Sequence, residues 1–181
     1  TYKRAALLLR DRERLLKLVS NEDRPVLFLF AGKAHPADLP GQQVLREIKQ
    51  VMLQPEFAGH IVFLEDYDIQ LARWLVTGVD VWLNNPIAPL EASGTSGMKA
   101  AINGRLNLSI LDGWWAEAFD GGNGWGISGA DVQDAGRRDA LDALVLQRHR
   151  HAAQCAPGGD VTAHDTGADD VHAPSLEVGL F

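Results

Sequence analysis

Short apolar runs alternate with amphipathic segments along the first two thirds of the chain. The apolar runs are hydrophobic at almost every consecutive position, which is typical of strands buried on both faces. They are Val26–Ala31, His60–Leu64, Val79–Leu83 and Leu106–Leu111. The segments between them have apolar residues at helical spacing. They are Ala5–Val19, Gln42–Leu53, Ile69–Thr77 with Gly78 as a C-cap, and a helix that continues through Ala100–Asn103 and ends at Gly104.

This alternation predicts an α/β fold, a Rossmann-like doubly wound parallel sheet. Ligands of such sheets bind beyond the carboxyl ends of the strands. The predicted loops at that edge are Gly32–Pro36, Glu65–Asp68, Asn84–Gly97 and Asp112–Trp115. The sequence therefore places any chemistry in these four loops.

The third loop leads into the stretch most suited to chemistry, Glu91-Ala92-Ser93-Gly94-Thr95-Ser96-Gly97-Met98-Lys99. Its glycines allow a tight turn and a close approach to a ligand. A helix that starts here would direct its first amide groups at a phosphate, and Lys99 would lie about one turn inside it. A shielded lysine beside an anion can form an imine with an aldehyde cofactor. The alternative is a Gly/Ser loop that caps a helix, with Lys99 solvated.

Composition excludes several other classes of protein. The chain has 181 residues, 46% hydrophobic, and a formal net charge of −7, which disfavours nucleic acid and anionic membrane surfaces as partners. The single cysteine, Cys155, excludes an intramolecular disulfide and fits a reducing, cytoplasmic compartment. No apolar run approaches the ~20 residues of a membrane span. The histidines of the tail lack the spacing of a metal site, so no metal is expected.

Several motifs, in order, resemble the α-glucan (glycogen/starch/maltodextrin) phosphorylase family, glycosyltransferase family 35, and in particular its bacterial branch. The motifs are Gly32-Lys33-Ala34, Phe63–Asp68, Val79–Pro86, Glu91–Lys99 with Asn103-Gly104, and Leu111–Trp115. The resemblance runs from Tyr2 to about Ile127. It implies the C-terminal domain of a two-domain GT-B fold, and an enzyme that cleaves terminal α-1,4-linked glucose with inorganic phosphate. The implied cofactor is pyridoxal 5′-phosphate, which acts through its phosphate group.

The resemblance also implies roles for individual residues. Lys99 would be the Schiff-base lysine, Thr95 would contact the cofactor phosphate and Tyr67 would pack near the cofactor. For the substrate, Glu91, Ser93 and Gly94 would hydrogen-bond glucosyl hydroxyls, and Lys3 would bind phosphate. From the residues alone, Tyr67 is equally well a surface aromatic and Lys3 an exposed terminal lysine. Trp114 and Trp115 are interpreted as packing residues, and Asp112 as a turn cap.

The expected organisation is a partial GT-B C-terminal domain at 1–130, a helix or linker at 131–152 and a loop or disordered tail at 153–181. The chain does not begin with Met, which suggests a fragment, a processed product or a late start. The family's N-terminal domain, a partner in the site, would lie before Thr1, together with a cationic pair that includes an essential arginine. The isolated chain is therefore expected to be inactive.

Three functions other than that of a phosphorylase are compatible with parts of the sequence. One is a non-catalytic remnant domain. Another is a nucleotide-sugar-dependent GT-B glycosyltransferase, many of which carry a second glutamate eight positions after the first, where this chain has Lys99. The last is a glycoside hydrolase that uses the acidic loop Glu65–Asp68, but acidic residues at a strand exit are mostly caps and solvated groups.

Overall fold

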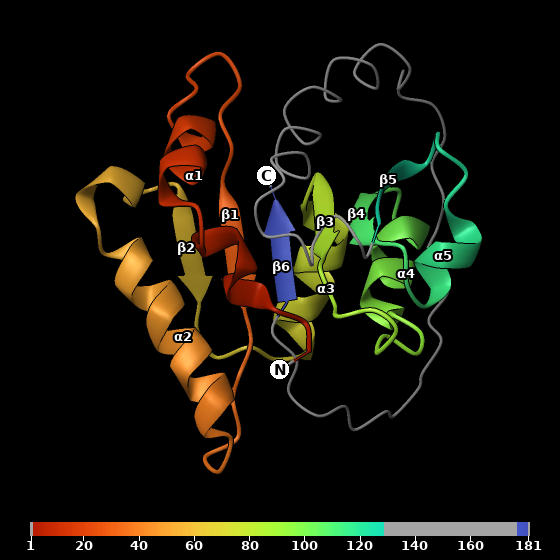
Figure 1. Cartoon of the computed structure of the whole chain (residues 1–181), viewed down its shortest axis with the longest axis horizontal. Coiled ribbons are helices and arrows are strands. Elements are labelled where there is room, and N and C mark those ends of the chain that lie inside the picture. Colours follow the sequence, from red (N-terminus) through yellow and green to blue (C-terminus); the bar gives the residue numbers. More distant parts are fainter. Residues whose placement is uncertain (1, 129–176, 181) are drawn as a thin grey trace.

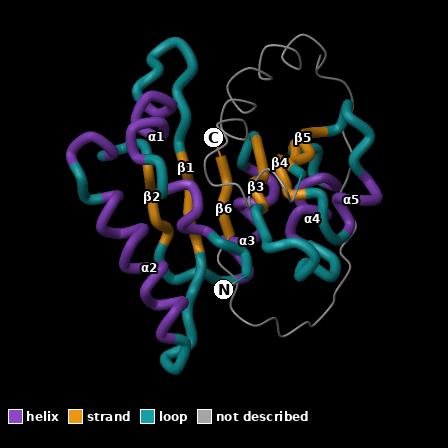
Figure 2. Tube along the Cα trace, viewed as in Figure 1, coloured by secondary structure: helices purple, strands orange, loops and turns teal. Residues whose placement is uncertain are grey.

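The computed structural model describes residues 2–128 and, for their backbone, residues 177–180. A six-stranded sheet lies between two groups of helices (Figures 1 and 2). The strands are β1 (Phe28–Ala31), β2 (Ile61–Leu64), β3 (Val81–Asn84), β4 (Leu106–Ile110), β5 (Gly124–Ile127) and β6 (Glu177–Leu180). The helices are η1 (Ala5–Leu9), α1 (Arg12–Val19), α2 (Leu39–Met52), η2 (Pro55–Phe57), α3 (Ile69–Gly78), α4 (Thr95–Ile102) and α5 (Trp114–Ala118).

The consecutive apolar positions of the strands form two cores because successive side chains point to opposite faces of the sheet. Phe28 and Phe30 of β1 belong to the larger core, on the side of η1, α1 and α2. Leu29 and Ala31 belong to the smaller core, which also contains Leu75 of α3 and Ala100 of α4. The predicted α/β fold with strands buried on both faces is confirmed.

The strand order β2-β1-β6-β3-β4-β5 determines where the chain reverses direction across the sheet. Strands β1 and β2 are parallel, and so are β3, β4 and β5. Both β1 and β3 are antiparallel to β6, so β1 and β3 run in the same direction. The chain proceeds outward through β1 and β2 on one side and through β3, β4 and β5 on the other. The topological switch point thus lies between β1 and β3, on either side of β6, and the carboxyl edge of β1 and β3 is the usual place for a ligand.

Strand β6 corrects the sequence-based expectation in two respects. The sheet was expected to be parallel, but β6 is antiparallel to both of its neighbours. Residues 177–180 were expected to be loop or disordered, but they occupy the middle of the sheet. A run of four residues carries no periodicity strong enough to separate a strand from a tail. The remainder of 153–181 and the helix or linker expected at 131–152 lie outside the described residues.

Local capping chemistry accounts for several element boundaries. The expected helix Ala5–Val19 is two helices, because the Asp11 side chain accepts a hydrogen bond from the Arg14 amide and starts α1 anew. The side chains of Asp38 and Asp68 start α2 and α3 in the same way. Gly78 is the last residue of α3 and not a left-handed C-cap, whereas Gly104 follows α4 with a φ of 73° as expected. Helix α5 and strand β5 were not predicted.

Across the part of the chain that the structure describes, none of the helices has the length and apolar character needed to span a membrane.

The position of β6 gives a testable consequence for stability. Removal of residues 177–181 would expose the facing edges of β1 and β3, which pair with β6 at Phe28–Ala31 and Val81–Leu83. We expect the free energy of unfolding, measured in urea, to fall by about 3 kcal/mol or more, at about 1 kcal/mol net for each ladder hydrogen bond. Removal of Phe181 alone is the matched control. Equal unfolding curves for the two truncations would contradict the central placement of β6.

Candidate functional site

The N-terminal residues 2–4 lie against residues 85–87, which follow β3 in the chain. The Ile87 amide donates to the Tyr2 carbonyl at 2.9 Å. The Arg4 guanidinium donates from Nε to the Asn85 carbonyl (3.0 Å) and from Nη2 to the Pro86 carbonyl (2.6 Å). In return, the Asn85 side-chain amide donates to the Arg4 carbonyl at 3.1 Å. Two segments more than 80 positions apart are thereby joined at the carboxyl edge of the sheet, next to the switch point.

Arg4 makes these contacts from an unusual conformation. Its φ is 45°, in the left-handed region that costs a non-glycine residue energy. Burial lowers the pKa of Arg4 below its usual range, and the nearby charge of Arg10 acts in the same direction. Arginine nevertheless stays protonated, because its reference pKa is far above neutral. The hydrogen bonds to two main-chain carbonyls compensate for the backbone strain and hold Lys3 next to the loop.

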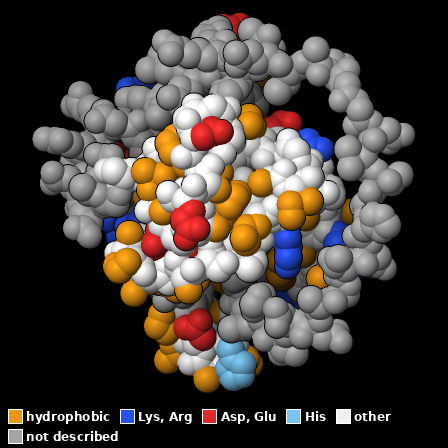
Figure 3. Space-filling model, turned by 90° about the vertical axis from the view of Figure 1, so that its right-hand side faces the viewer, with side chains coloured by type: hydrophobic (Ala, Val, Ile, Leu, Met, Phe, Trp, Pro, Cys, Tyr) orange, Lys and Arg blue, Asp and Glu red, His pale blue; other side chains and the backbone are white. Residues whose placement is uncertain are grey.

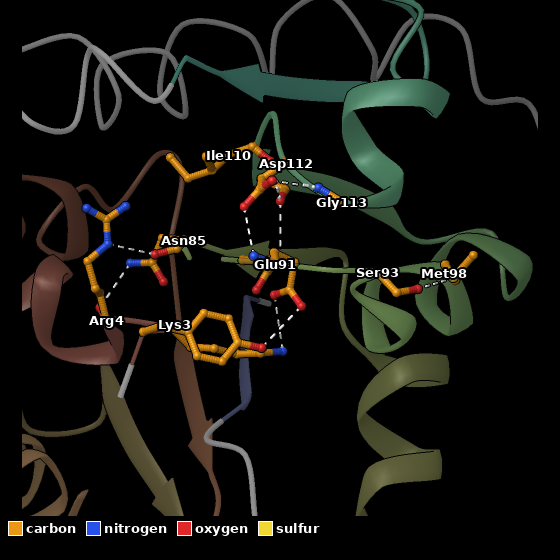
Figure 4. A network of polar contacts seen from close by, with 12 residues as sticks. Lys3, Arg4, Asn85, Glu91, Ser93, Met98, Ile110, Asp112 and Gly113 are labelled. Carbon is orange, nitrogen blue, oxygen red and sulfur yellow. Dashed lines mark hydrogen bonds and ion pairs between the residues drawn. The ribbon is translucent and has the colours of Figure 1, made fainter. Parts of the chain in front are cut away.

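Glu91 is the centre of a network of polar contacts that lies between Lys3 and Asp112 (Figure 4). Its side chain is 5% exposed. Oε1 accepts a hydrogen bond from the Tyr2 hydroxyl at 3.2 Å. Oε2 lies 3.6 Å from the Lys3 ammonium, which is an ion-pair distance, and it has no hydrogen-bond partner. A buried carboxylate oxygen in this state can accept a hydrogen bond from a ligand, which would remove a cost of about 1–3 kcal/mol.

Helix α4 begins without the side-chain cap that α1, α2 and α3 have. Its N-cap is Gly94, with a φ of 88° and no side-chain hydrogen bond to the helix. The first amides of a helix need acceptors and carry the positive end of the helix dipole, so this start suits an anion. Thr95 and Lys99 are both exposed on this helix, so the described residues do not shield Lys99 as the imine chemistry was expected to require. Residue types and helix start together fit a cofactor that has an aldehyde and a phosphate.

The other expected site residues lie around this helix and loop. Tyr67 is half-buried and packs against the smaller core, which contains Ala100, the neighbour of Lys99. Ser93 is exposed, and its hydroxyl contacts the Met98 sulfur at 3.9 Å. Lys3 and Glu91 are in direct contact.

Two residues of this region were not found from the sequence. Tyr2 reaches Glu91 across 89 positions, a separation that no local pattern reveals. Asn107 is 1% exposed on β4 and donates to the Gly97 carbonyl at 3.2 Å. A polar residue in the middle of a buried strand, as in Leu106–Ile110, is the signal that could have indicated it.

Residues 2–128 contain no group of three or more His, Cys, Asp or Glu side chains that could hold a metal ion. The histidines of the tail lie outside the described residues.

Replacement of Arg4 tests the contact between the two segments. We expect Arg4→Ala to lower the free energy of unfolding by about 1–2 kcal/mol and to speed hydrogen exchange at the Ile87 amide, because charged donors to carbonyls are lost. Exchange can be followed by NMR and stability by urea unfolding. Arg10→Ala is the control, since Arg10 is an exposed neighbour in sequence. If both variants changed the Ile87 amide equally, the contact would not depend on Arg4.

Comparison with known proteins agrees with the resemblance seen in the sequence. The family model described as carbohydrate phosphorylase matches residues 2–121. A glycogen phosphorylase of Aquifex aeolicus is 56% identical over 145 residues, which are 80% of this chain and 21% of that protein. A maltodextrin phosphorylase of Thermococcus litoralis is 55% identical over 147 residues, 81% of this chain and 18% of that protein. A glycogen phosphorylase of Mycobacterium bovis is 54% identical over 147 residues, 81% of this chain and 17% of that protein. The chain thus spans about a fifth of the length of these relatives.

The family model covers more than half of the chain, and the chain therefore belongs to the carbohydrate phosphorylase family.

Proposed function

We propose that this chain is the cofactor-binding part of an α-glucan phosphorylase. Such an enzyme cleaves terminal α-1,4-linked glucose from glycogen or maltodextrin with inorganic phosphate and releases glucose 1-phosphate. The observation that carries the proposal is the buried Oε2 of Glu91, which forms an ion pair with Lys3 but has no hydrogen-bond partner, ahead of the uncapped start of α4. A sugar hydroxyl supplies the missing donor, and a phosphate suits the lysine and the helix start.

Glu91, Ser93 and Gly94 bind the glucosyl unit. The carboxylate of Glu91 accepts from one hydroxyl through Oε2, while the Tyr2 hydroxyl keeps Oε1 in place. The exposed hydroxyl of Ser93 is an adaptable donor and acceptor for a second hydroxyl. Gly94 brings the backbone close, as a glycine at positive φ permits.

Thr95, Lys99 and Tyr67 hold pyridoxal 5′-phosphate. The amine of Lys99 would attach to its aldehyde carbon, Thr95 would contact its phosphate at the start of α4, and Tyr67 would pack beside it. When bound, the cofactor supplies its phosphate group to the reaction. Lys3 then has a second role. Its side chain is 19% exposed, and its ammonium can bind the substrate phosphate in addition to the carboxylate of Glu91.

The rest of the enzyme completes the site. The proposed whole protein has a two-domain GT-B fold, and an N-terminal domain covers the loop from the other side. Several apolar side chains on the loop and α4 are solvent-exposed, namely Leu90 (57%), Met98 (37%) and Ile102 (84%). Figure 3, which views the molecule from the right-hand side of Figure 1, shows hydrophobic side chains scattered among few charged ones.

A nucleotide-sugar-dependent glycosyltransferase is the alternative within the same fold. The residue at position 99 favours the phosphorylase. This chain has a lysine there, whereas many of the glycosyltransferases have a second glutamate. The match to the phosphorylase family model points the same way. Saturable binding of a nucleotide sugar by this chain would revive the alternative.

Covalent labelling tests the cofactor assignment. The purified chain is incubated with pyridoxal 5′-phosphate, reduced with borohydride and digested, and the modified lysines are quantified by mass spectrometry. We expect Lys99 to be labelled well above the other lysines, because the start of α4 binds the phosphate and raises the local concentration of the aldehyde.

Two variants control this experiment. Lys99→Ala should abolish the selective label. Lys17→Ala should leave it unchanged, since Lys17 is exposed on the last turn of α1, which leads to the amino end of β1. Label spread over many lysines, without enrichment at Lys99, would refute the assignment.

The isolated chain is expected to show no phosphorolysis. It spans about a fifth of the length of its relatives, and the proposed covering domain that completes the site is not in the tested chain. The measurement is glucose 1-phosphate released from maltodextrin and phosphate in the presence of the cofactor. Product that forms with this chain and disappears in Lys99→Ala would contradict the expectation.

A further inference from the structure

The corner between β4 and α5 holds the Glu91–Lys99 segment from the side opposite the N-terminal residues. The Asp112 carboxylate accepts two main-chain hydrogen bonds, at 2.9 Å from the Glu91 amide through Oδ2 and at 2.9 Å from the Gly113 amide through Oδ1. Figure 4 shows Asp112 on one side of Glu91 and Lys3 on the other. Glu91 is therefore fixed at its backbone by Asp112 and at its side chain by Tyr2 and Lys3.

The corner also contacts the next residues of the loop through its backbone. The Trp114 amide donates to the Ser93 carbonyl at 2.8 Å. Gly113 has a φ of 55°, and a Cβ added to it would lie 2.6 Å from the Ser93 oxygen and 2.8 Å from the Glu91 oxygen. The corner and the loop are thus as close as their main chains allow.

The indole of Trp114 continues this contact to the start of α4. An added Cβ on Gly94 would lie 3.0 Å from Cδ1 of the indole, and one on Gly97 would lie 3.0 Å from its Nε1. Asp112 and Trp114 together therefore determine how Glu91 is placed relative to Thr95 and Lys99. A turn cap at Asp112 and packing by Trp114 do not by themselves require a hydrogen bond from Asp112 to Glu91. Glu91 is the residue whose buried Oε2 has no hydrogen-bond partner.

We propose that Asp112 is a positioning residue, which sets the orientation of Glu91 and, through the adjoining Trp114, the start of α4. The consequence for ligand binding rests on the proposed function. The placement of Glu91 itself does not, because it follows from the hydrogen bonds of the protein alone.

The test uses the full 181-residue chain with three substitutions. Asp112→Ala removes both acceptors. Asp112→Asn retains one oxygen that can accept from the Glu91 amide. Asp38→Ala is the matched control, since Asp38 is also a half-buried carboxylate that accepts from a main-chain amide, that of Gly41 at the start of α2.

Three readouts separate positioning from general stability. They are hydrogen exchange at the Glu91 and Gly113 amides by NMR, the melting temperature, and the selectivity of pyridoxal phosphate labelling at Lys99. For Asp112→Ala we expect exchange at the Glu91 amide to rise about tenfold or more and Lys99 selectivity to fall several-fold. Asp112→Asn should restore most of both. Asp38→Ala should lower the melting temperature without either effect.

The outcomes distinguish this inference from the function. If unaltered protein showed no selective label at Lys99, the proposed function would fail, and the placement of Glu91 would be judged on amide exchange alone. Unchanged exchange at Glu91 in Asp112→Ala would overturn the positioning role. So would loss of selectivity to the same extent in Asp38→Ala, or an Asp112→Asn variant as impaired as Asp112→Ala.

Discussion

The placement of one buried carboxylate, that of Glu91, depends on three parts of the chain that are distant in sequence. Tyr2 and Lys3 contact its oxygens, Asp112 holds its amide, and β3 delivers it to the edge of the sheet. A 5% exposed carboxylate with one oxygen that lacks a hydrogen-bond partner costs folding free energy. The cost is offset because the Lys3 ammonium and main-chain contacts hold the loop from both sides.

The sheet explains why these parts meet. The reversal of strand order between β1 and β3 opens a place at the carboxyl edge, which the N-terminal residues and the loop after β3 enter together. The parallel direction of β3 and β4 brings their exits, and thus Glu91 and Asp112, side by side. Gly94 and Gly97 then allow the loop and α4 to pack against Trp114. This edge of the sheet is where the proposed function places the substrate and the cofactor.

Local patterns predicted what depends on local physics. Four buried strands, the helix that begins near Thr95 and the loop that carries Glu91 followed from apolar runs, glycines and helical spacing. The Tyr2–Glu91 and Arg4–Asn85 contacts did not, because residues more than 80 positions apart leave no periodic signal. Asp112 was read as a turn cap; it does bind the Gly113 amide, but its other oxygen binds Glu91. Strand β6 was missed because pairing with β1 and β3, and not its own sequence, makes it a strand.

A crystal structure of the chain grown with pyridoxal 5′-phosphate would test most directly the claim that this edge of the sheet is a cofactor and sugar site. The account predicts electron density continuous with the Nζ of Lys99 and a phosphate at the amide groups that start α4. It also predicts Glu91 held between Tyr2 and Asp112 as described here. Cofactor attached only to other lysines, with the start of α4 in contact with solvent alone, would contradict it.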